Sequence, residues 1–347
     1  MVYLIEPNKD KFGHSFIYLQ ELLKIQDTIA LQMDVDIRPL FGWLNFLSVV
    51  KYYIALRKQL QAVPPNNIAH LLYADLYYKI PFVSSRLLHR NKTIVTMHSC
   101  PNGRVKHWLM KNFCKRVDAV VVHSEYIKQQ LENMGLTNVH LIDYPSFYDY
   151  STIGSRDEVR RKFGFSQHDI VLSALGGIRK DKGLDILLEA FKYINTESKK
   201  RIVLNIAGKE GFMTAREVEQ KCTELEIRTH LTIRPLTDEE FMENVIVTDY
   251  MVMPYRGNMT GNSGPMTEAI VCGIPSVVPA NTNLGYIADK ESIGFTFIQE
   301  NAQDLAGILT QILNVTCQSY PSNYSKRLTT NMFRQAYTKV YNNCKTL

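Results

Sequence analysis

The chain has 347 residues, of which 45% are hydrophobic and 21% charged, with a net charge of +6 and a sequence pI near 8.8. This composition excludes disordered and fibrous proteins, and the length exceeds what one compact core usually holds, so we expect two domains. The mildly basic charge suits an anionic substrate or a membrane surface and does not choose between them.

The N-terminal half alternates short β-rich runs with helical stretches, which predicts a parallel sheet covered by helices. The predicted strands are 2–5, 28–33, 68–73, 93–97, 119–123 and 139–142. Around residues 144–155 this alternation gives way to Pro, Ser, Gly and aromatic residues, which indicates a domain boundary. We therefore predict an N-terminal domain of residues 1–150.

The second half repeats the alternation and predicts another α/β domain, residues 151–321. Its predicted strands are 170–175, 201–207, 231–234, 250–253 and 276–278. After the first of them, Leu184, Leu187, Leu188, Phe191 and Ile194 have the spacing of a helix with one buried face. Residues 322–343 predict a terminal amphipathic helix, whose aromatic stripe we interpret as packing.

No segment predicts a leader or a membrane span. The opening MVYLIEP is interpreted as a first strand, and the longest apolar run, 41–56, is interrupted by Asn45, Ser48 and Lys51. The six cysteines are scattered without a C-x-x-C pair, so we expect them to be reduced and the protein to be cytoplasmic.

The segment 249–279 predicts an anion-binding loop. A strand-length apolar run is followed by a loop rich in glycine and asparagine, and then by Pro265, which suits a first helical position. With Ser263 or Gly264 as the N-cap, we expect the amides of Met266 and Thr267 to face the loop. A loop at the carboxyl end of a parallel strand is where open α/β sheets bind ligands.

A second candidate is the segment 175–189, where a strand ends in Gly176 and Gly177 and a basic turn with Arg179 and Lys182 leads into a helix. Such a turn offers a phosphate two cations and a helix start. The alternative is an ordinary turn with solvated charges. The absence of G-x-x-x-x-G-K-[ST] and of G-x-G-x-x-G after the first strand disfavours P-loop NTPases, kinases and dehydrogenases.

Together, GGIRKDKGLDILLEA (176–190) and MPYRGNMTGNSGPMTEAIVCGIPSVVP (253–279) resemble the donor-site signature of the GT-B glycosyltransferases, in particular the retaining glycosyltransferase group 1 (GT4) family. TIVTMHS (93–99) and DAVVVHSEYIKQQL (118–131) resemble the family more loosely. The resemblance implies two Rossmann-like parallel-sheet domains facing a central cleft, with residues 322–347 packing back on the N-terminal domain.

It also implies the activity: transfer of a sugar from a nucleotide-diphosphate-sugar donor to an acceptor hydroxyl with retention of configuration, without a metal or another cofactor. By family habit the acceptor is a glycan, a polysaccharide or a lipid-linked sugar. The letters D-x-D at Asp34 and Asp36 are interpreted as a strand-end turn, not as metal ligands.

Several residues take roles from the resemblance. Arg179 and Lys182 match the basic pair that holds the diphosphate and stabilises it as the leaving group, and Glu268 matches the acid that holds the ribose hydroxyls. The amides of Ser263, Gly264, Met266 and Thr267 match those that bind the distal phosphate, whereas Pro265 has none to donate.

Gly13 matches the N-terminal glycine that lets its loop approach the donor, and His98 matches the histidine that faces the transferred sugar. For His98 the alternative is a hydrogen-bonded core histidine. Two positions depart from the pattern: Gly177, in the donor-binding turn, stands where an arginine is common, and Thr260 replaces the first glutamate of the usual E-x7-E pair.

Other interpretations stay open. A non-hydrolysing sugar-nucleotide epimerase has the same fold, and the loss of the acid at Thr260 also fits a catalytically weak sugar-nucleotide-binding subunit. The basic and apolar segment 103–116 can lie on anionic lipid as a peripheral membrane contact, although core packing explains its apolar residues as well. The sequence has no stretch in which aromatic and basic residues interleave, so we expect no nucleic-acid partner.

Overall fold

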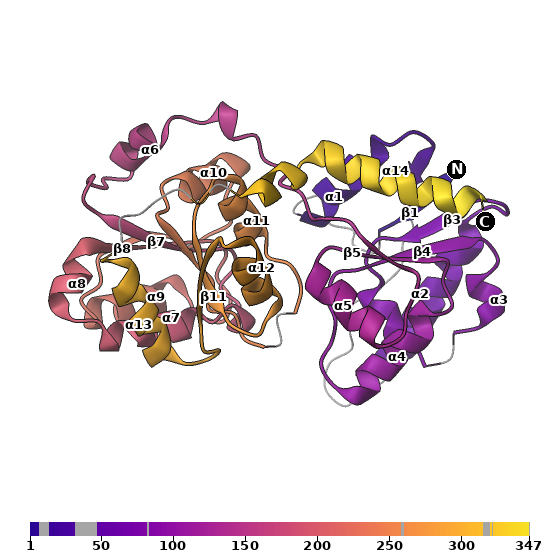
Figure 1. The fold of residues 1–347 in the computed structure, drawn as a ribbon, viewed down its shortest axis with the longest axis horizontal. Helices are drawn as coiled ribbons and strands as arrows, with labels where there is room; N and C mark the ends of the chain where they lie inside the picture. Colours follow the sequence, from indigo (N-terminus) through magenta and orange to yellow (C-terminus); the bar gives the residue numbers. More distant parts are fainter. Residues whose placement is uncertain are drawn as a thin grey trace. The chain divides into compact units, whose positions relative to one another are not determined.

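The computed structural model describes residues 1–6, 14–31, 47–81, 83–257, 260–314, 320 and 322–346. It divides into two compact units, one formed by Met1–Pro145 with Thr329–Leu347 and the other by Ser146–Leu328 (Figure 1). Within the described ranges each unit has one six-stranded sheet, and every strand pair is parallel. The predicted fold class, two α/β units with parallel sheets, is confirmed.

The first unit has the strand order β2-β1-β3-β4-β5-β6. Its strands are β1 (Val2–Ile5), β2 (Thr28–Ala30), β3 (Ile68–Leu71), β4 (Lys92–Met97), β5 (Ala119–Val122) and β6 (Val139–Leu141). Its helices are α1 (His14–Leu23), α2 (Ser48–Ala62), the 3-10 helix η2 (Ala74–Lys79), α3 (Ser85–Leu88), α4 (Arg104–Cys114), α5 (Glu125–Asn133) and α14 (Thr330–Thr346).

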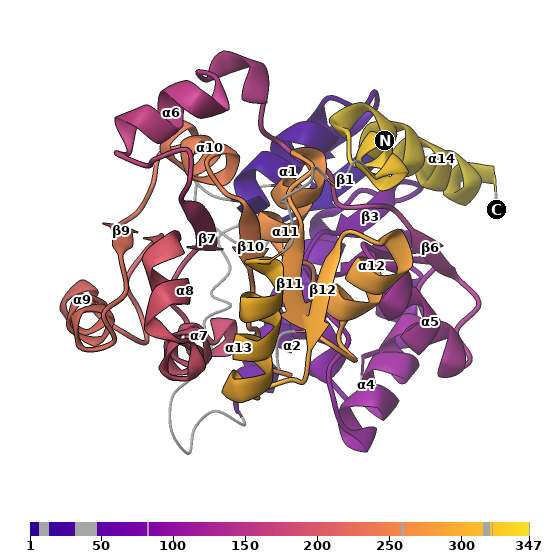
Figure 2. The same ribbon diagram turned by 60° about the vertical axis from the view of Figure 1, so that its left-hand side comes forward.

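Both faces of this sheet are covered. Figures 1 and 2 show α2, α4 and α5 on one face and α1 with α14 on the other, and all four residues of β3 and of β5 are buried. Burial on both faces explains why these strands have continuous apolar runs instead of an alternating pattern.

The terminal helix α14 joins the first unit through a chain of buried hydrogen bonds, whose direction is set at one end by a backbone carbonyl. Nδ1 of His123 lies 2.7 Å from the Ile142 oxygen, which can only accept, so the ring donates there and Nε2 must accept. Tyr18 therefore donates to Nε2 over 3.0 Å and accepts from the hydroxyl of Tyr337 in α14.

The same reasoning gives the direction of the remaining hydrogen bonds in this series. Because Tyr337 donates to Tyr18, its oxygen accepts from Thr96 at 3.0 Å, and Thr96 in turn accepts from Nε2 of His70 at 2.9 Å. Nδ1 of His70 then accepts from the Tyr341 hydroxyl at 2.8 Å. Burial lowers the pKa of His70 and of His123 to about 3, which keeps both rings neutral as this arrangement requires.

The second unit has the strand order β12-β11-β10-β7-β8-β9. Its strands are β7 (Ile170–Leu175), β8 (Ile202–Ala207), β9 (Thr229–Thr232), β10 (Tyr250–Val252), β11 (Ser276–Pro279) and β12 (Gly294–Phe297). Its α-helices are α6 (Arg156–Lys162), α7 (Leu184–Ala190), α8 (Thr196–Arg201), α9 (Ala215–Glu224), α10 (Asp238–Ile246), α11 (Gly264–Val271), α12 (Asn283–Glu291) and α13 (Ala302–Ile312). Short 3-10 helices are η3 (Tyr150–Thr152), η4 (Lys180–Lys182), η5 (Phe191–Tyr193) and η6 (Asn323–Arg327).

Local sequence explains where several of these helices begin. Helices α6, α9 and α10 each start with a capping box, in which a serine or threonine hydroxyl and a glutamate three residues later satisfy each other's backbone amides. In Figures 1 and 2, α7, α9 and α13 lie on one face of the sheet and α10, α11 and α12 on the other, and each set has its own apolar cluster.

The predicted elements differ from the structure most clearly at three places. Strand β9 lies at Thr229–Thr232 instead of 231–234, because it is a polar edge strand without an apolar run. Strand β12 is not predicted, since Gly294 interrupts its short apolar pattern where the backbone of Ser276 approaches too closely for a side chain. The terminal helix begins at Thr330, not at 322, because Tyr324 and Leu328 are buried in the second unit and hold η6 there.

Within the described part of the chain, no helix is long and apolar enough to cross a membrane. The described cysteines, Cys100, Cys114, Cys222, Cys272 and Cys344, are free thiols. Gly13 and the pair Asp34 and Asp36 lie outside the described residues.

Replacing Tyr337 with Phe should destabilise the protein by about 1–3 kcal/mol, because the Thr96 hydroxyl and the Tyr18 oxygen would lose a buried partner. Denaturant unfolding measures the change. The control Tyr193→Phe alters a side chain that is 54% exposed and should stay within about 0.5 kcal/mol of the unchanged protein. Equal stability of the two variants would contradict the stabilising role of these buried hydrogen bonds.

Candidate functional site

The topology of the second sheet selects one edge as the site. From β7 the chain builds β8 and β9 on one side and then returns to build β10, β11 and β12 on the other. Ligands bind at the carboxyl ends of strands where the order reverses in this way, which here lies between β7 and β10. The loops that follow these two strands contain the two predicted donor segments, 176–190 and 253–279.

A close backbone contact joins these loops. Gly183 has φ +68°, in the left-handed region, and a Cβ at this position would lie 2.0 Å from the carbonyl oxygen of Pro254. Arg256 strengthens the junction: its amide donates to the Asp181 oxygen over 2.8 Å, and its guanidinium binds Asp185 with contacts of 2.9 and 2.7 Å. A side chain in place of Gly183 would force the loops apart.

Lys182 is held by a neutral partner instead of a carboxylate. Its Nζ donates to the Tyr255 hydroxyl over 2.5 Å and lies 4.2 Å from the centre of the ring. Because an ammonium can only donate, Tyr255 must donate onward to Ser263 Oγ at 3.0 Å, and Ser263 to Met253 Sδ at 3.4 Å. The lysine charge is thereby positioned beside the start of α11 without being neutralised.

Ser263 is the N-cap of α11 and Pro265 lies in its first turn, as predicted. The amide of Thr267 donates to the Ser263 carbonyl over 3.0 Å, so it belongs to the first helical turn and is not available, contrary to the prediction. Among the described residues, the amides of Gly264 and Met266 have no partner. They are the donors that α11 offers to an anion.

Glu268 is buried, and a single oxygen of its carboxylate makes its hydrogen bonds. Oε2 accepts from Ser146 Oγ at 2.6 Å and from the Tyr150 hydroxyl at 3.1 Å, and no described residue donates to Oε1. Burial raises the pKa of Glu268 to about 7, although the two hydrogen bonds oppose this shift. Oε1 is therefore the atom left for the predicted ribose hydroxyls.

The remaining predicted residues of this unit lie in the same two loops. Arg179 is exposed and its guanidinium is paired with Asp181 through contacts of 3.0 and 2.7 Å, so a phosphate would have to share or replace that carboxylate. The amide of Gly177 has no partner within the described chain. Thr260 is half-buried in a loop fastened by Asn283, whose Nδ2 donates to the Gly261 oxygen over 3.1 Å.

His98 belongs to the first unit, at the carboxyl end of β4. Its ring stacks on Tyr73 with centroids 4.1 Å apart, and Nε2 donates to the Leu72 oxygen over 2.8 Å, so that Nδ1 is left without a partner among the described residues. Burial lowers the pKa of His98 despite the opposing charge of Asp75. The Asp75 carboxylate accepts from the amides of His98 and Ser99, each over 3.0 Å, and so fixes this loop.

Sequence reasoning misses several residues of the site. Tyr255 and Arg256 lie inside the recognised segment, and their polar or charged side chains beside a predicted strand end were the available signal. Ser146 and Tyr150 stand more than 100 residues before Glu268, and no local pattern connects them. Gly13 lies outside the described residues.

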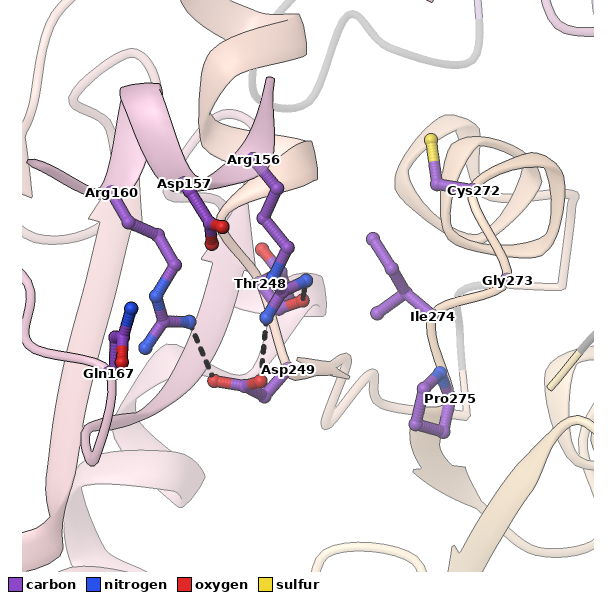
Figure 3. Close-up of a pocket in the computed structure, with 10 residues that line it drawn as sticks. All are labelled: Arg156, Asp157, Arg160, Gln167, Thr248, Asp249, Cys272, Gly273, Ile274 and Pro275. Atoms are coloured by element: carbon purple, nitrogen blue, oxygen red, sulfur yellow. Dashed lines mark hydrogen bonds and ion pairs between the residues drawn. The ribbon is translucent and has the colours of Figure 1, made fainter. Parts of the chain in front are cut away.

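A different hollow of about 500 Å³ lies at the opposite, amino-terminal edge of the second sheet (Figure 3). Both of its arginines face the same carboxylate: Arg156 contacts Asp249 at 2.6 Å and Arg160 contacts it at 3.1 Å. Asp249 also accepts from the Val171 amide at 2.7 Å. The two guanidiniums share this one carboxylate and also donate to backbone carbonyls around it, so their donors are occupied in holding α6 to the sheet.

Comparison with protein families decides the identity. Residues 155–331 match the family described as glycosyl transferases group 1, and residues 27–143 match glycosyltransferase family 4. The chain belongs to the group 1 glycosyl transferases. Like other members it is a glycosyltransferase with the GT-B fold, and no curated protein matches it.

Solved structures similar to this glycosyltransferase agree on the fold. Sucrose-phosphate synthase from Thermosynechococcus elongatus has a TM-score of 0.74 at 16% identity, covering 99% of this chain and 98% of its own. The Anabaena protein HepE, in complex with UDP, has a TM-score of 0.69 at 14% identity and covers 99% of both chains. A Rickettsia africae glycosyltransferase has a TM-score of 0.63 at 15% identity, covering 99% of this chain and 89% of its own.

In this glycosyltransferase, Gly183→Ala should cost about 2–5 kcal/mol of stability, since it adds left-handed strain to a collision with Pro254. Gly164→Ala is the matched control. Its φ of +74° is similar but nothing lies within 4 Å of the added atom, so only the strain of about 1–2 kcal/mol is expected. Equal losses in denaturant unfolding would show that the loop contact adds nothing.

Glu268→Gln should change how stability depends on pH. The pKa of about 7 in the folded chain exceeds the ordinary 4.5, so the stability that the protonated carboxyl contributes is full below pH 4.5 and is lost as pH rises through 7. The stability of the variant relative to the unchanged protein should therefore rise between pH 4.5 and 7, by roughly 2–3 kcal/mol. Unfolding at several pH values measures it, the exposed Glu219→Gln variant gives the baseline, and a pH-independent difference would contradict the burial argument.

Proposed function

We propose that this glycosyltransferase binds a nucleotide-diphosphate sugar at the carboxyl edge of the second sheet and transfers the sugar to an acceptor hydroxyl. Lys182 and Arg179 bind the diphosphate, Gly177, Gly264 and Met266 donate their amides to it, and Oε1 of Glu268 accepts from the ribose. As the family resemblance implies, Gly13 lets its loop approach the donor, and His98 contacts the transferred sugar.

One observation carries this proposal. The Lys182 ammonium is bound to Tyr255, and Tyr255 is bound to the N-cap serine of α11, so a cation and a helix N-terminus lie at one place. A helix N-terminus favours an anion by about 0.3–1 kcal/mol, and a charge-assisted hydrogen bond contributes about 1.5–3 kcal/mol. Since the only partner of Lys182 within the described chain is a neutral phenol, its full charge is available to a leaving diphosphate.

We propose retention of configuration and no need for a divalent metal or cofactor. As the glycosidic bond breaks, negative charge develops on the diphosphate, and fixed cations stabilise it where it develops. Arg179 supplies a forked guanidinium, which matches phosphate oxygens, and Lys182 supplies a point charge. Together they fulfil the electrostatic role that a metal has in other transferases.

For the donor, uridine diphosphate sugars are the first choice. HepE was solved with UDP and glucose, and an E. coli trehalose-6-phosphate protein with UDP-2-fluoro glucose. For the acceptor we propose a glycan, a polysaccharide or a lipid-linked sugar.

We also propose a cytoplasmic location with a peripheral membrane contact at α4. This helix buries Met110 and Phe113 in the core, as the alternative interpretation expects, but leaves Val105 and Trp108 72% and 55% exposed beside Arg104 and Lys106. Exposed apolar residues next to cations are the combination that anionic lipid attracts.

Lys182→Ala should lower turnover on the order of 100-fold, because a cation that acts on the leaving group is removed. Lys180→Ala is the matched control: it removes the same charge from the same turn, but its ammonium lies over Phe212, 5.7 Å from the ring centre, and not on Tyr255. Thermal shifts with a panel of nucleotide sugars select the donor beforehand, since a ligand at 100 times its dissociation constant adds about 2.7 kcal/mol. Turnover is then measured with and without EDTA, which should not change it.

The outcomes separate the alternatives. Equal turnover of the two lysine variants would remove Lys182 from the mechanism. A donor that is converted to its epimer without any acceptor indicates an epimerase, which mass spectrometry of the donor detects. Donor binding without turnover on any acceptor indicates a binding subunit.

A further inference from the structure

A hollow in the first unit is lined by basic residues that have no acidic partner among the described residues. It measures about 720 Å³ and lies between α2 and α3, which pack together (Figure 1). Its described lining contains no acidic residue and consists of Tyr53, Arg57, Gln61, Ser84, Arg86, Leu87, His89 and Arg90.

Within the part of the chain that the structure describes, the charges of this hollow have no carboxylate partner. Within the described chain, Arg57, Arg86 and Arg90 have neither an ion pair nor a hydrogen bond. In the hollow beside α6, by contrast, Arg156 and Arg160 both contact Asp249. Like charges that share one hollow repel one another, and an anion bound among them would relieve this repulsion.

The walls of the hollow are fixed by buried contacts. Nδ2 of Asn91, just after α3, donates to the oxygen of Val63, the C-cap residue of α2, over 3.2 Å. The Leu88 oxygen accepts from Thr93 Oγ1 at 2.7 Å, and Arg116, two residues after the end of α4, donates to the Val83 oxygen. Because these bonds hold the backbone on both sides, a ligand would not have to pay for ordering it.

Within the first unit, the hollow is separate from His98, a residue that this unit contributes to the proposed transfer site. Arg90 precedes β4 and His98 follows it, so they stand at opposite edges of the sheet. The six residues of β4 span about 20 Å. Gln61 likewise lies near the end of α2, before the start of β3.

We propose that this hollow is a second ligand site, which binds a phosphate or diphosphate group. Planar guanidiniums match phosphate oxygens in forked pairs, and a phosphomonoester carries a charge of about −1.5 to −2 at neutral pH, which suits several cations better than a single carboxylate does. The hydroxyl of Ser84, the N-cap of α3 without a capping bond of its own, adds a neutral donor. The group belongs either to a soluble phosphate compound or to a lipid headgroup.

The test compares Arg57→Ala/Arg86→Ala with Lys58→Ala, which removes a charge from the same helix outside the lining. Both are made in a Lys182→Ala background, so that the transfer site contributes less to anion binding. Calorimetry with inorganic pyrophosphate measures the dissociation constant of each variant relative to the Lys182→Ala parent. It should be at least about tenfold higher in the arginine variant and within about twofold of the parent for Lys58→Ala. Arg57→Lys/Arg86→Lys keeps the charge but loses the forks and should fall between them.

Cosedimentation with vesicles distinguishes the two sources. Phosphatidic acid vesicles carry a phosphomonoester headgroup, and phosphatidylcholine vesicles are the control. Loss of pyrophosphate binding in the arginine variant supports a soluble ligand. If this variant loses binding to phosphatidic acid vesicles but still binds pyrophosphate, the result supports a headgroup. If the arginine variant matches Lys58→Ala with both probes, the hollow is not a phosphate site.

Discussion

The donor site depends on one backbone contact, the approach of Gly183 to the carbonyl of Pro254. Parallel strands bring the loops after β7 and β10 to the same edge, but only a residue without a side chain lets them touch. Once they touch, Arg256 can reach Asp185 and Lys182 can reach Tyr255. The cation therefore takes its place beside the helix N-terminus as a consequence of one glycine.

The partners of the basic residues separate structural from functional positions. Arg156 and Arg160 share the carboxylate of Asp249 and hold α6 to the sheet. Lys182 meets only a phenol in the described chain, and the exposed Arg179 keeps a half-buried partner, Asp181, that a ligand can replace. A cation that is paired with a fixed carboxylate attracts a further anion less strongly, whereas a cation bound to a neutral hydroxyl remains available to an anion.

Most of the architecture could be predicted from the sequence, because buried parallel strands have continuous apolar runs and amphipathic helices have a regular period. The predictions fail where that signal is weak. Polar β9 and the glycine-containing β12 lack an apolar run, and the start of α14 is set by the burial of Tyr324 and Leu328 in the other unit. Tertiary contacts override local pattern at these three places.

The sequence alone determined the fold class, the family resemblance and the two segments of the donor site, because glycine turns, helix caps and apolar runs are local properties of the chain. Tertiary structure alone decided that the Thr267 amide is used, that Tyr255 holds Lys182, and that Ser146 and Tyr150 bind Glu268 from more than 100 residues away. It also decided which arginines are paired with a carboxylate. The physical reason is that hydrogen bonds, burial and ion pairs act between atoms that are close in space, and only folding brings those atoms together.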